Sequence, residues 1–308
     1  MIKNILFALV FIAAPAGLPP AASVTPSKVA EVPGYTEGVV VGSDGAVYFS
    51  DVFNGTVYRV RGGAPEVWAK TGAPNGHKIM ADGTHLVCDG SQRAVLRLDA
   101  EGRTLGKVSS ECDGKPLRSP NDLTLDNAGG FYFTDPGGSN LQNPIGTVHY
   151  VDARGKTHLV AEGLAFPNGI VLRPDGRTLL VAESQHNRIL SYEVVAPGRL
   201  GVRRVFAELP TKEGGQIANE PDGICLDRAG NLYVAHYGMR QVQVLSPAGR
   251  LLRRYAAGNL TTSNVAFGGP RMDQLYVTGA LGEEKTTRGG LFRLDLKGVK
   301  GLKTVSGK

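Results

Sequence analysis

Two short apolar runs joined by an Asp/Gly turn recur six times along this chain. The clearest copy is "SPNDLTLDNAGGFYFTDP", residues 119–136. The copies follow one another at intervals of roughly 40 to 50 residues, which is typical of repeat architectures whose units bury their apolar faces against each other. Stretches such as "TVYRV" and "QVQVL" alternate apolar and polar residues, which is the period of a half-exposed strand. The pattern predicts an all-β fold.

Each repeat contains an apolar run, an Asp- or Asn-containing turn, a second run, a polar turn and an alternating third run. No helical period interrupts this order. Four-stranded units repeated six times around a channel form a six-bladed β-propeller. A two-sheet sandwich is the alternative, but it does not explain why the repeats are so regular. The stretch "KVAEVPGY", residues 28–35, is a candidate strand that joins the last blade and closes the ring, with Pro33 confined to an edge or a strand end.

The first position of every repeat carries a side-chain oxygen. Its occupants are Glu37, Asn75, Asn121, Asn168, Asp222 and Asn264. In a propeller these positions form a ring, and a ring of carboxylates and carboxamides is a hard-cation site. Asn or Asp before Gly is also common in ordinary turns, but Glu37 is not a favoured turn former. Because two carboxylates facing one narrow channel repel unless a cation or proton lies between them, we expect a central metal-binding channel.

A second set of positions ends the second run of each repeat. Its members are Asp51, Asp89, Asp135, Glu183, His236 and Gly279. Propeller geometry predicts that this set shares a face with the ring. An Asp that closes a strand often caps the following turn, so capping is the favoured interpretation for the three aspartates. His236 is expected over the channel, where a functional role and a hydrogen-bonding role are about equally supported. Arg118 is a candidate contact for an anionic substrate, although a surface location is favoured.

The first 23 residues resemble an export signal. A positive residue, Lys3, precedes an apolar run over residues 5–17, and small residues follow it. No other apolar stretch approaches the roughly 20 residues of a membrane helix. We therefore expect an exported protein, periplasmic or secreted, with no membrane span. Residues 24–308 are expected to form one propeller domain.

Charge and cysteine usage exclude several kinds of site. The net charge is +6, yet Lys and Arg are scattered without a dense run, so a nucleic-acid partner is not expected. Three cysteines, Cys88, Cys112 and Cys225, allow at most one disulfide. No CxxC pair, nucleophile elbow, HExxH motif or P-loop is present. Any catalysis therefore has to come from a metal and the carboxylates.

Five motifs resemble the SMP-30/gluconolactonase/luciferin-regenerating-enzyme (LRE) family of six-bladed propellers. They are "YTEG", "SPNDLTLD", "FPNGIVLRPDGRTLLVAES", "EPDGICLDRAGNLYVAH" and "TSNVAFGGPRMDQLYVTGA", in family order over residues 37–295. The resemblance implies one divalent metal ion in the channel, usually calcium, with zinc, manganese, magnesium or iron in some members. It places the metal ligands at Glu37, Asn168 and Asp222. Asn121 would lie beside the metal, and Asp222 would also be the catalytic base or nucleophile.

The sequence departs from the family at one position. Sugar lactonases of the family can carry an Arg two residues before the Asn of the "PND" motif. Ser119 occupies that place here, and Arg118 lies one residue away.

The resulting hypothesis is a divalent-metal-dependent hydrolase that opens a lactone. The cation would polarise the ring carbonyl, and Asp222 would take a proton from the attacking water. Asn121, Asn75 and His236 would contact the substrate, with His236 lending or accepting a proton. Two alternatives remain: a phosphotriesterase-like hydrolase that uses the same site, and a non-catalytic ligand-binding propeller whose cation is structural.

Overall fold

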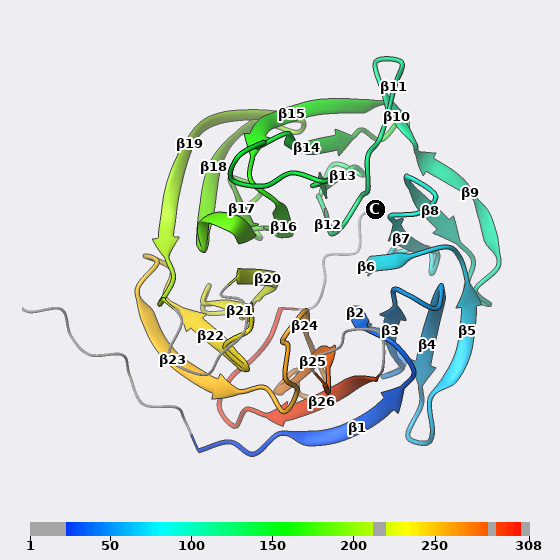
Figure 1. Cartoon of the computed structure of the whole chain (residues 1–308), viewed down its shortest axis with the longest axis vertical. Coiled ribbons are helices and arrows are strands. Elements are labelled where there is room, and N and C mark those ends of the chain that lie inside the picture. The colour runs from blue at the N-terminus through cyan, green and yellow to red at the C-terminus, as the bar shows by residue number, and fades with distance from the viewer. Residues whose placement is uncertain (1–22, 212–219, 283–287, 303–308) are drawn as a thin grey trace, which may run out of the picture.

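Six four-stranded antiparallel sheets surround a central axis (Figure 1). The computed structural model describes residues 23–211, 220–282 and 288–302. The six-bladed propeller expected from the repeats is confirmed, and the two-sheet sandwich is wrong. The expected export signal lies outside the described residues, apart from its last position. In the described part of the chain, no helix combines the length and apolar character needed to cross a bilayer.

The six blades follow the chain in order. Blade 1 contains β2 (Thr36–Val41), β3 (Val47–Asp51), β4 (Thr56–Val60) and β5 (Glu66–Lys70), and blade 2 contains β6 (Pro74–Ile79), β7 (His85–Asp89), β8 (Ala94–Leu98) and β9 (Thr104–Ser109). Blade 3 contains β12 (Leu123–Leu125), β13 (Phe131–Asp135), β14 (Gly146–Val151) and β15 (Thr157–Leu164), and blade 4 contains β16 (Pro167–Leu172), β17 (Thr178–Glu183), β18 (Arg188–Ala196) and β19 (Arg199–Glu208). Blade 5 contains β20 (Glu220–Leu226), β21 (Leu232–Tyr237), β22 (Gln241–Leu245) and β23 (Leu251–Ala256). Blade 6 contains β24 (Val265–Gly268), β25 (Gln274–Ala280), β26 (Gly289–Asp295) and β1 (Ser27–Val32).

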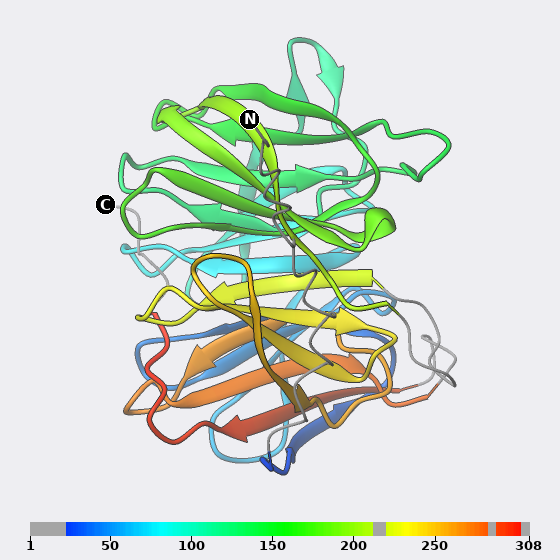
Figure 2. The same ribbon diagram turned by 90° about the vertical axis from the view of Figure 1, so that its left-hand side faces the viewer.

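Two small elements lie outside the blades. A hairpin of β10 (Glu111–Cys112) and β11 (Lys115–Pro116) follows blade 2, and a three-residue 3-10 helix, Ser184–His186, follows β17. The first strand of every blade lies nearest the axis, and later strands lie progressively outward (Figure 1). Figure 2 shows the same blades from the side. The inner strands therefore form the wall of the channel.

The first strand of the chain closes the ring. β1 pairs antiparallel with β26, from Ser27 opposite Arg293 to Val32 opposite Gly289. Pro33 follows directly after the strand, so the ladder does not need the hydrogen-bond donor that proline lacks. The predicted closing strand is thus confirmed, and blade 6 is built from both ends of the described chain.

The hydrophobic core is divided among the spaces between neighbouring blades. Six apolar clusters each join two adjacent blades. Tyr48 of blade 1 and Leu96 of blade 2 share one of them, for example. Cys88 and Cys225 belong to or pack against such clusters, and all three cysteines are free. Burial raises the pKa of the Cys88 thiol well above its ordinary value, so it behaves as a small apolar side chain.

Four of the histidines are buried within the blades. Nε2 of His77 and Nδ1 of His85 are 2.7 Å apart and share one hydrogen bond, beside the rings of Tyr48 and Trp68. Burial lowers the pKa of His85 to about 4 and holds that of His77 well below its ordinary value. It also lowers the pKa of His149 to about 4. These imidazoles are neutral at pH 7, because charging them would place an uncompensated cation in the core.

Acidification should therefore begin to destabilise the fold at pH values higher than those at which carboxylates titrate. Each of these histidines binds its proton more weakly in the folded state than in the unfolded state, where the pKa is near 6.5. The stability it contributes is present above pH 6.5 and is lost as the pH falls towards about 4. Urea unfolding should show a loss of about 1 to 2 kcal/mol per buried histidine between pH 7 and pH 5.

Replacing His149 with Gln should remove part of this pH slope, because the amide does not titrate. Equal slopes in the wild type and the His149→Gln variant would contradict the assignment.

Removing the closing strand should cost more stability than its length suggests. A chain that begins at residue 33 loses the burial of Ala30 and Val32 and leaves the β26 edge unpaired. At about 1.5 to 3 kcal/mol for a buried valine, less for alanine, and about 1 kcal/mol for a hydrogen bond, the expected loss is about 3 to 6 kcal/mol. Urea unfolding measures it. A chain that begins at residue 23 is the matched control and should keep wild-type stability.

Candidate functional site

The inner strands carry an irregularity at the ring positions. In blades 1, 2, 4 and 5, the register between the first two strands shifts directly after the residue that begins the repeat or its neighbour. Such β-bulges re-aim side chains and are frequent beside functional sites. At the first of them, Gly38 has φ +50, and a Cβ there would lie 1.7 Å from the Asn75 carbonyl oxygen. Glycine is required because the next blade approaches this closely.

A closed circuit of hydrogen bonds links the ring positions from blade to blade. The six links are Ser50 Oγ to Asn75 O (2.8 Å), Gly76 N to Asn121 O (2.7 Å), Thr134 Oγ1 to Asn168 O (2.7 Å), Ser184 Oγ to Pro221 O (2.7 Å), Gly223 N to Ser263 O (2.7 Å) and Ser263 Oγ to Thr36 O (2.7 Å). Each blade therefore contacts the next one at or beside its ring residue. The structure brings all six predicted positions together around the axis, and the chemical roles of their side chains stay predictions.

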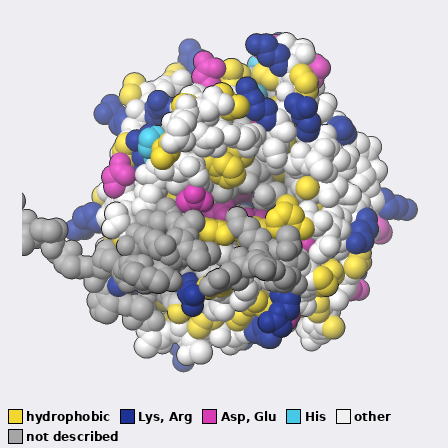
Figure 3. All heavy atoms as spheres, viewed as in Figure 1, with side chains coloured by type: hydrophobic (Ala, Val, Ile, Leu, Met, Phe, Trp, Pro, Cys, Tyr) yellow, Lys and Arg dark blue, Asp and Glu magenta, His cyan; other side chains and the backbone are white. Residues whose placement is uncertain are grey.

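Two buried carboxylates occupy ring positions of different blades. Glu37 is 4% exposed and Asp222 is 6% exposed. Asn264 links their surroundings: its Nδ2 donates to Glu37 Oε2 at 3.4 Å, and its side chain lies against Gly223, the residue after Asp222. The pKa of Tyr35 is raised well above its usual value, first by burial and then by the charges of Glu37 and Asp222. Acidic side chains are visible in a hollow at the middle of the face shown in Figure 3.

The amide side chains of the ring are used differently from one another. Asn168 donates from Nδ2 to Ser184 Oγ at 3.3 Å, which leaves its Oδ1 as the oxygen available to a cation. Asn264 uses both ends: Nδ2 donates to Glu37 Oε2 at 3.4 Å and Oδ1 accepts from Val265 N at 2.8 Å. Asn264 therefore holds Glu37 in place. Asn121 is buried and Asn75 is half-buried.

The available donors fit a hard cation. Glu37 and Asp222 supply carboxylates and Asn168 supplies an amide oxygen, which are the ligand types preferred by calcium and magnesium. Within the described ranges, no group of three or more His, Cys, Asp or Glu side chains converges. A site built from imidazoles and thiolates, as structural zinc prefers, is therefore not present in that part of the chain.

The second set of residues lies beside the ring, as predicted, but its carboxylates accept hydrogen bonds from backbone N–H groups. Asp51 pairs in register with Thr36 and Asp89 with Pro74, at the start of the inner strands. Asp89 accepts from the backbone N–H groups of Gly72 and Ala73, at 2.7 and 3.1 Å. Asp135 likewise accepts from Arg118 N and Ser119 N, and Glu183 accepts from Ala165 N. Asp51 and Asp89 also accept from Asn54 N and Gln92 N, which belong to the turn that follows each strand. The capping interpretation is confirmed for Asp51 and Asp89, whereas Asp135 holds the segment that leads into the inner strand of its blade.

His236 is fully buried next to blade 4. Its Nε2 lies 2.8 Å from Asn187 Oδ1. The Asn187 amide nitrogen donates to the carbonyls of Leu209 and Pro210, so Oδ1 must be the acceptor and His236 carries its proton on Nε2. Burial lowers the pKa of His236 to about 3. The imidazole is therefore neutral, which argues against the expected proton transfer, and its contact with substrate stays a prediction.

Sequence reasoning missed a buried ion pair next to the ring amides. Lys78 Nζ lies 3.5 Å from Asp122 Oδ1, and Asp122 is 1% exposed. In the register of the first two strands, Lys78 corresponds to Val40 and Cys225 in other blades. A charged residue at a position that is otherwise uncharged was the available signal. Tyr35, whose pKa both carboxylates raise, was also missed, because it precedes the repeat.

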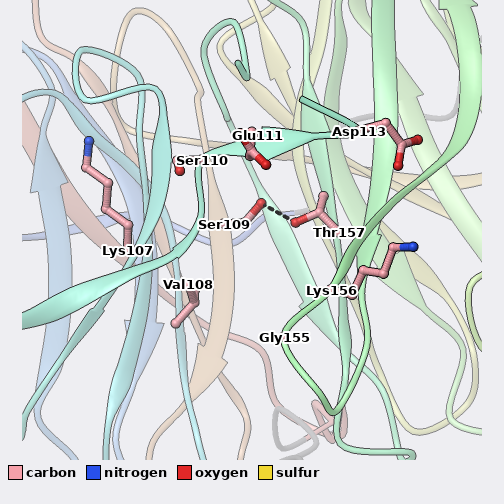
Figure 4. A pocket seen from close by; sticks show the side chains of 9 residues that line it. All are labelled: Lys107, Val108, Ser109, Ser110, Glu111, Asp113, Gly155, Lys156 and Thr157. Atoms are coloured by element: carbon pink, nitrogen blue, oxygen red, sulfur yellow. Dashed lines mark hydrogen bonds between the residues drawn. The ribbon is translucent and has the colours of Figure 1, made fainter. Parts of the chain in front are cut away.

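Other sequence candidates and cavities lie away from the ring. Arg118 is exposed, as the surface interpretation predicted. A cavity of about 660 Å³ lies at the opposite mouth of the channel, lined by the turns that end β2, β6 and β24. A polar cleft of about 340 Å³ lies on the rim between blades 2 and 3, where Ser109 and Thr157 are hydrogen-bonded (Figure 4). Neither cavity is lined by a ring residue.

Comparison with known proteins gives matches of modest identity over much of the chain. Lactonase drp35 of Staphylococcus epidermidis is 29% identical over 69% of this chain and 66% of its own length. The gluconolactonase of Zymomonas mobilis is 32% identical over 63% of this chain and 57% of its own length. These matches therefore span less than two thirds of the relatives' lengths. The solved structure of a gluconolactonase from Xanthomonas campestris superposes with a TM-score of 0.76 at 26% identity, covering 89% of this chain and 90% of that one.

A family profile described as the SMP-30/gluconolactonase/LRE-like region matches residues 35–281. That range begins at Tyr35 and contains every ring position from Glu37 to Asn264. With the six blades and the ring in place, the chain belongs to the SMP-30/gluconolactonase/LRE-like family.

Proposed function

We propose that this protein is a metal-dependent hydrolase that opens lactones, with the cation held by Glu37, Asn168 and Asp222. The observation that carries the proposal is the burial of two carboxylates, Glu37 and Asp222, at ring positions linked through Asn264, which donates to Glu37 and lies against Gly223. Two like charges buried together are stable only with a compensating cation or proton. A divalent ion bound there supplies positive charge that polarises an ester carbonyl and stabilises a developing oxyanion.

The ring residues and Tyr35 have different proposed roles in proton transfer and substrate binding. Asp222 is the candidate base, because a carboxylate within reach of the attacking water can take its proton. Asn121 and Asn75 lie on neighbouring blades and are placed to orient the substrate through their amides. Tyr35 is protonated at neutral pH, as an ordinary phenol is, and its raised pKa strengthens that preference, so it is a candidate hydrogen-bond donor and does not compete as a base.

A lactone is preferred over a phosphotriester as the substrate class. The curated relatives described above carry the names lactonase and gluconolactonase, and the structural relative is a gluconolactonase. Calcium is the proposed ion because every donor is an oxygen. The apolar N-terminal stretch supports a location outside the cytoplasm. A non-catalytic binding propeller is the competing possibility, and turnover decides between the two.

Asp222→Asn should lower kcat/KM for lactone hydrolysis by about 100-fold or more, the scale expected when general-base catalysis is lost. The side chain keeps its size, so circular dichroism and the melting temperature should stay close to wild type. The exposed Asp295→Asn variant is the control and should keep full activity. Wild-type rates in a folded Asp222→Asn protein would refute the mechanism.

Removing metal should abolish turnover without unfolding the protein. After treatment with chelator, lactone hydrolysis should fall to background and should return on adding calcium, with magnesium, manganese, zinc and iron compared in parallel. The melting temperature should fall only modestly, because interblade packing supplies most of the stability. Glu37→Gln should weaken calcium binding measured by calorimetry. Full turnover by metal-free protein would contradict the proposal, and calcium binding without turnover of any lactone would favour the binding propeller.

A further inference from the structure

A buried ion pair lies beside the ring, between blades 2 and 3. Lys78 is on β6, and Asp122 directly precedes β12. The Lys78 side chain is 18% exposed and the Asp122 side chain 2%. Lys78 Nζ also donates to the His77 carbonyl at 3.2 Å, and Asp122 Oδ1 accepts from Leu123 N at 2.8 Å. Both charges are therefore held by backbone groups as well as by each other.

Lys78 lies on β6, the strand of blade 2 nearest the propeller axis. Its charge lowers the pKa of two thiols, Cys88 and Cys225, against the larger effect of burial. Cys88 is in blade 2, like Lys78 itself, whereas Cys225 is on the inner strand of blade 5. The direction of both effects agrees with the place of Lys78 on an inner strand.

The pair connects the same two segments that carry the ring amides. Asn75 lies three residues before Lys78 on β6, and Asn121 directly precedes Asp122. Gly76 N donates to the Asn121 carbonyl at 2.7 Å. The backbone hydrogen bond and the ion pair are thus two links between one pair of segments, and two links fix relative orientation where one permits rotation.

The proposed roles of the ring residues indicate which function these two links support. Blades 1, 4 and 5 carry Glu37, Asn168 and Asp222, the proposed cation ligands. Blades 2 and 3 carry Asn75 and Asn121, the proposed substrate contacts. The ion pair itself joins the two blades on the substrate side of the ring. The Asp122 carboxylate also faces the backbone N–H of Ile170 in blade 4, a contact that the amide oxygen of an Asp122→Asn variant can keep.

We propose that Lys78 and Asp122 are positioning residues that fix the Asn75 and Asn121 amides relative to each other and take no part in holding the cation. Burying two charges is expensive, and such pairs are best understood as enforcing one geometry and not as adding net stability. The link to lactone binding rests on the proposed function. The link to the two amides rests on the geometry alone.

Lys78→Met tests the pair, since methionine keeps an unbranched side chain and removes the ammonium. The double variant Lys78→Met/Asp122→Asn removes both charges and avoids a lone buried carboxylate, which protects the test if the single variant folds poorly. Arg59→Met is the matched control: Arg59 is 23% exposed and pairs with Glu66 at 2.7 Å on the outer part of blade 1.

The first measurement does not depend on activity. In protein labelled with ¹⁵N-asparagine, the side-chain amide signals of Asn75, Asn121 and Asn168 can be assigned from single Asn→Ala variants. Loss of the pair should shift the signals of Asn75 and Asn121 and leave that of Asn168 in place. Arg59→Met should shift none of them. Unchanged Asn75 and Asn121 signals in the double variant would overturn the proposal, whatever the enzyme does.

The second measurement separates substrate from metal. KM for a lactone should rise about tenfold with kcat within about threefold, the pattern of lost uniform binding, while calcium affinity by calorimetry stays within about twofold of wild type. A loss of calcium affinity as large as the change in KM would show that the pair supports the whole ring, and would overturn the proposal. If wild-type protein opens no lactone, the proposed function fails, and the amide signals still decide the positioning role.

Discussion

The close approach of six inner strands at the axis is the constraint on which the rest of this structure depends. Each blade meets the next through a carbonyl that accepts from a Ser or Thr hydroxyl or a backbone N–H. There is no room for a side chain at Gly38, where a Cβ would meet the Asn75 carbonyl oxygen. The pairing of a ring residue with a following glycine is therefore a packing requirement. The same packing turns the oxygen-bearing side chains towards a common channel.

Acidic residues near the axis fall into two classes that differ in what their carboxylates interact with. Asp89, Asp135 and Glu183 accept hydrogen bonds from backbone N–H groups of the segments that lead into inner strands, so their negative charge is used in holding the fold. Glu37 and Asp222 come from blades 1 and 5 and raise the pKa of the same phenol. Only the second class is proposed to take a cation. The hydrogen-bonded segments of the first class hold the inner strands that carry those two carboxylates.

The propeller, the closing strand and the ring positions could be predicted, because each depends on local chemistry repeated along the chain. Strand alternation, turn residues and a fixed spacing from Glu37 onwards can all be read directly from the amino-acid sequence. Other features had no local signature. Asn264 reads as one more ring amide, but both of its amide atoms are engaged by Glu37 and Val265. His236 reads as a proton carrier, but burial lowers its pKa to about 3, and burial comes from neighbouring blades.

By itself the sequence determined the number of blades, the strand that closes them and the identity of the residues at the axis, since hydrophobic period and turn chemistry act over a few residues. Tertiary structure alone decided which of those residues share their charges and hydrogen bonds. The pairing of Lys78 with Asp122 joins two blades across 44 positions of sequence, and the influence of Glu37 and Asp222 on Tyr35 joins blades 1 and 5. Which residues interact by charge or by hydrogen bond depends on their distance in space. The sequence pattern does not give that distance, because it is set only when the six blades close into a ring.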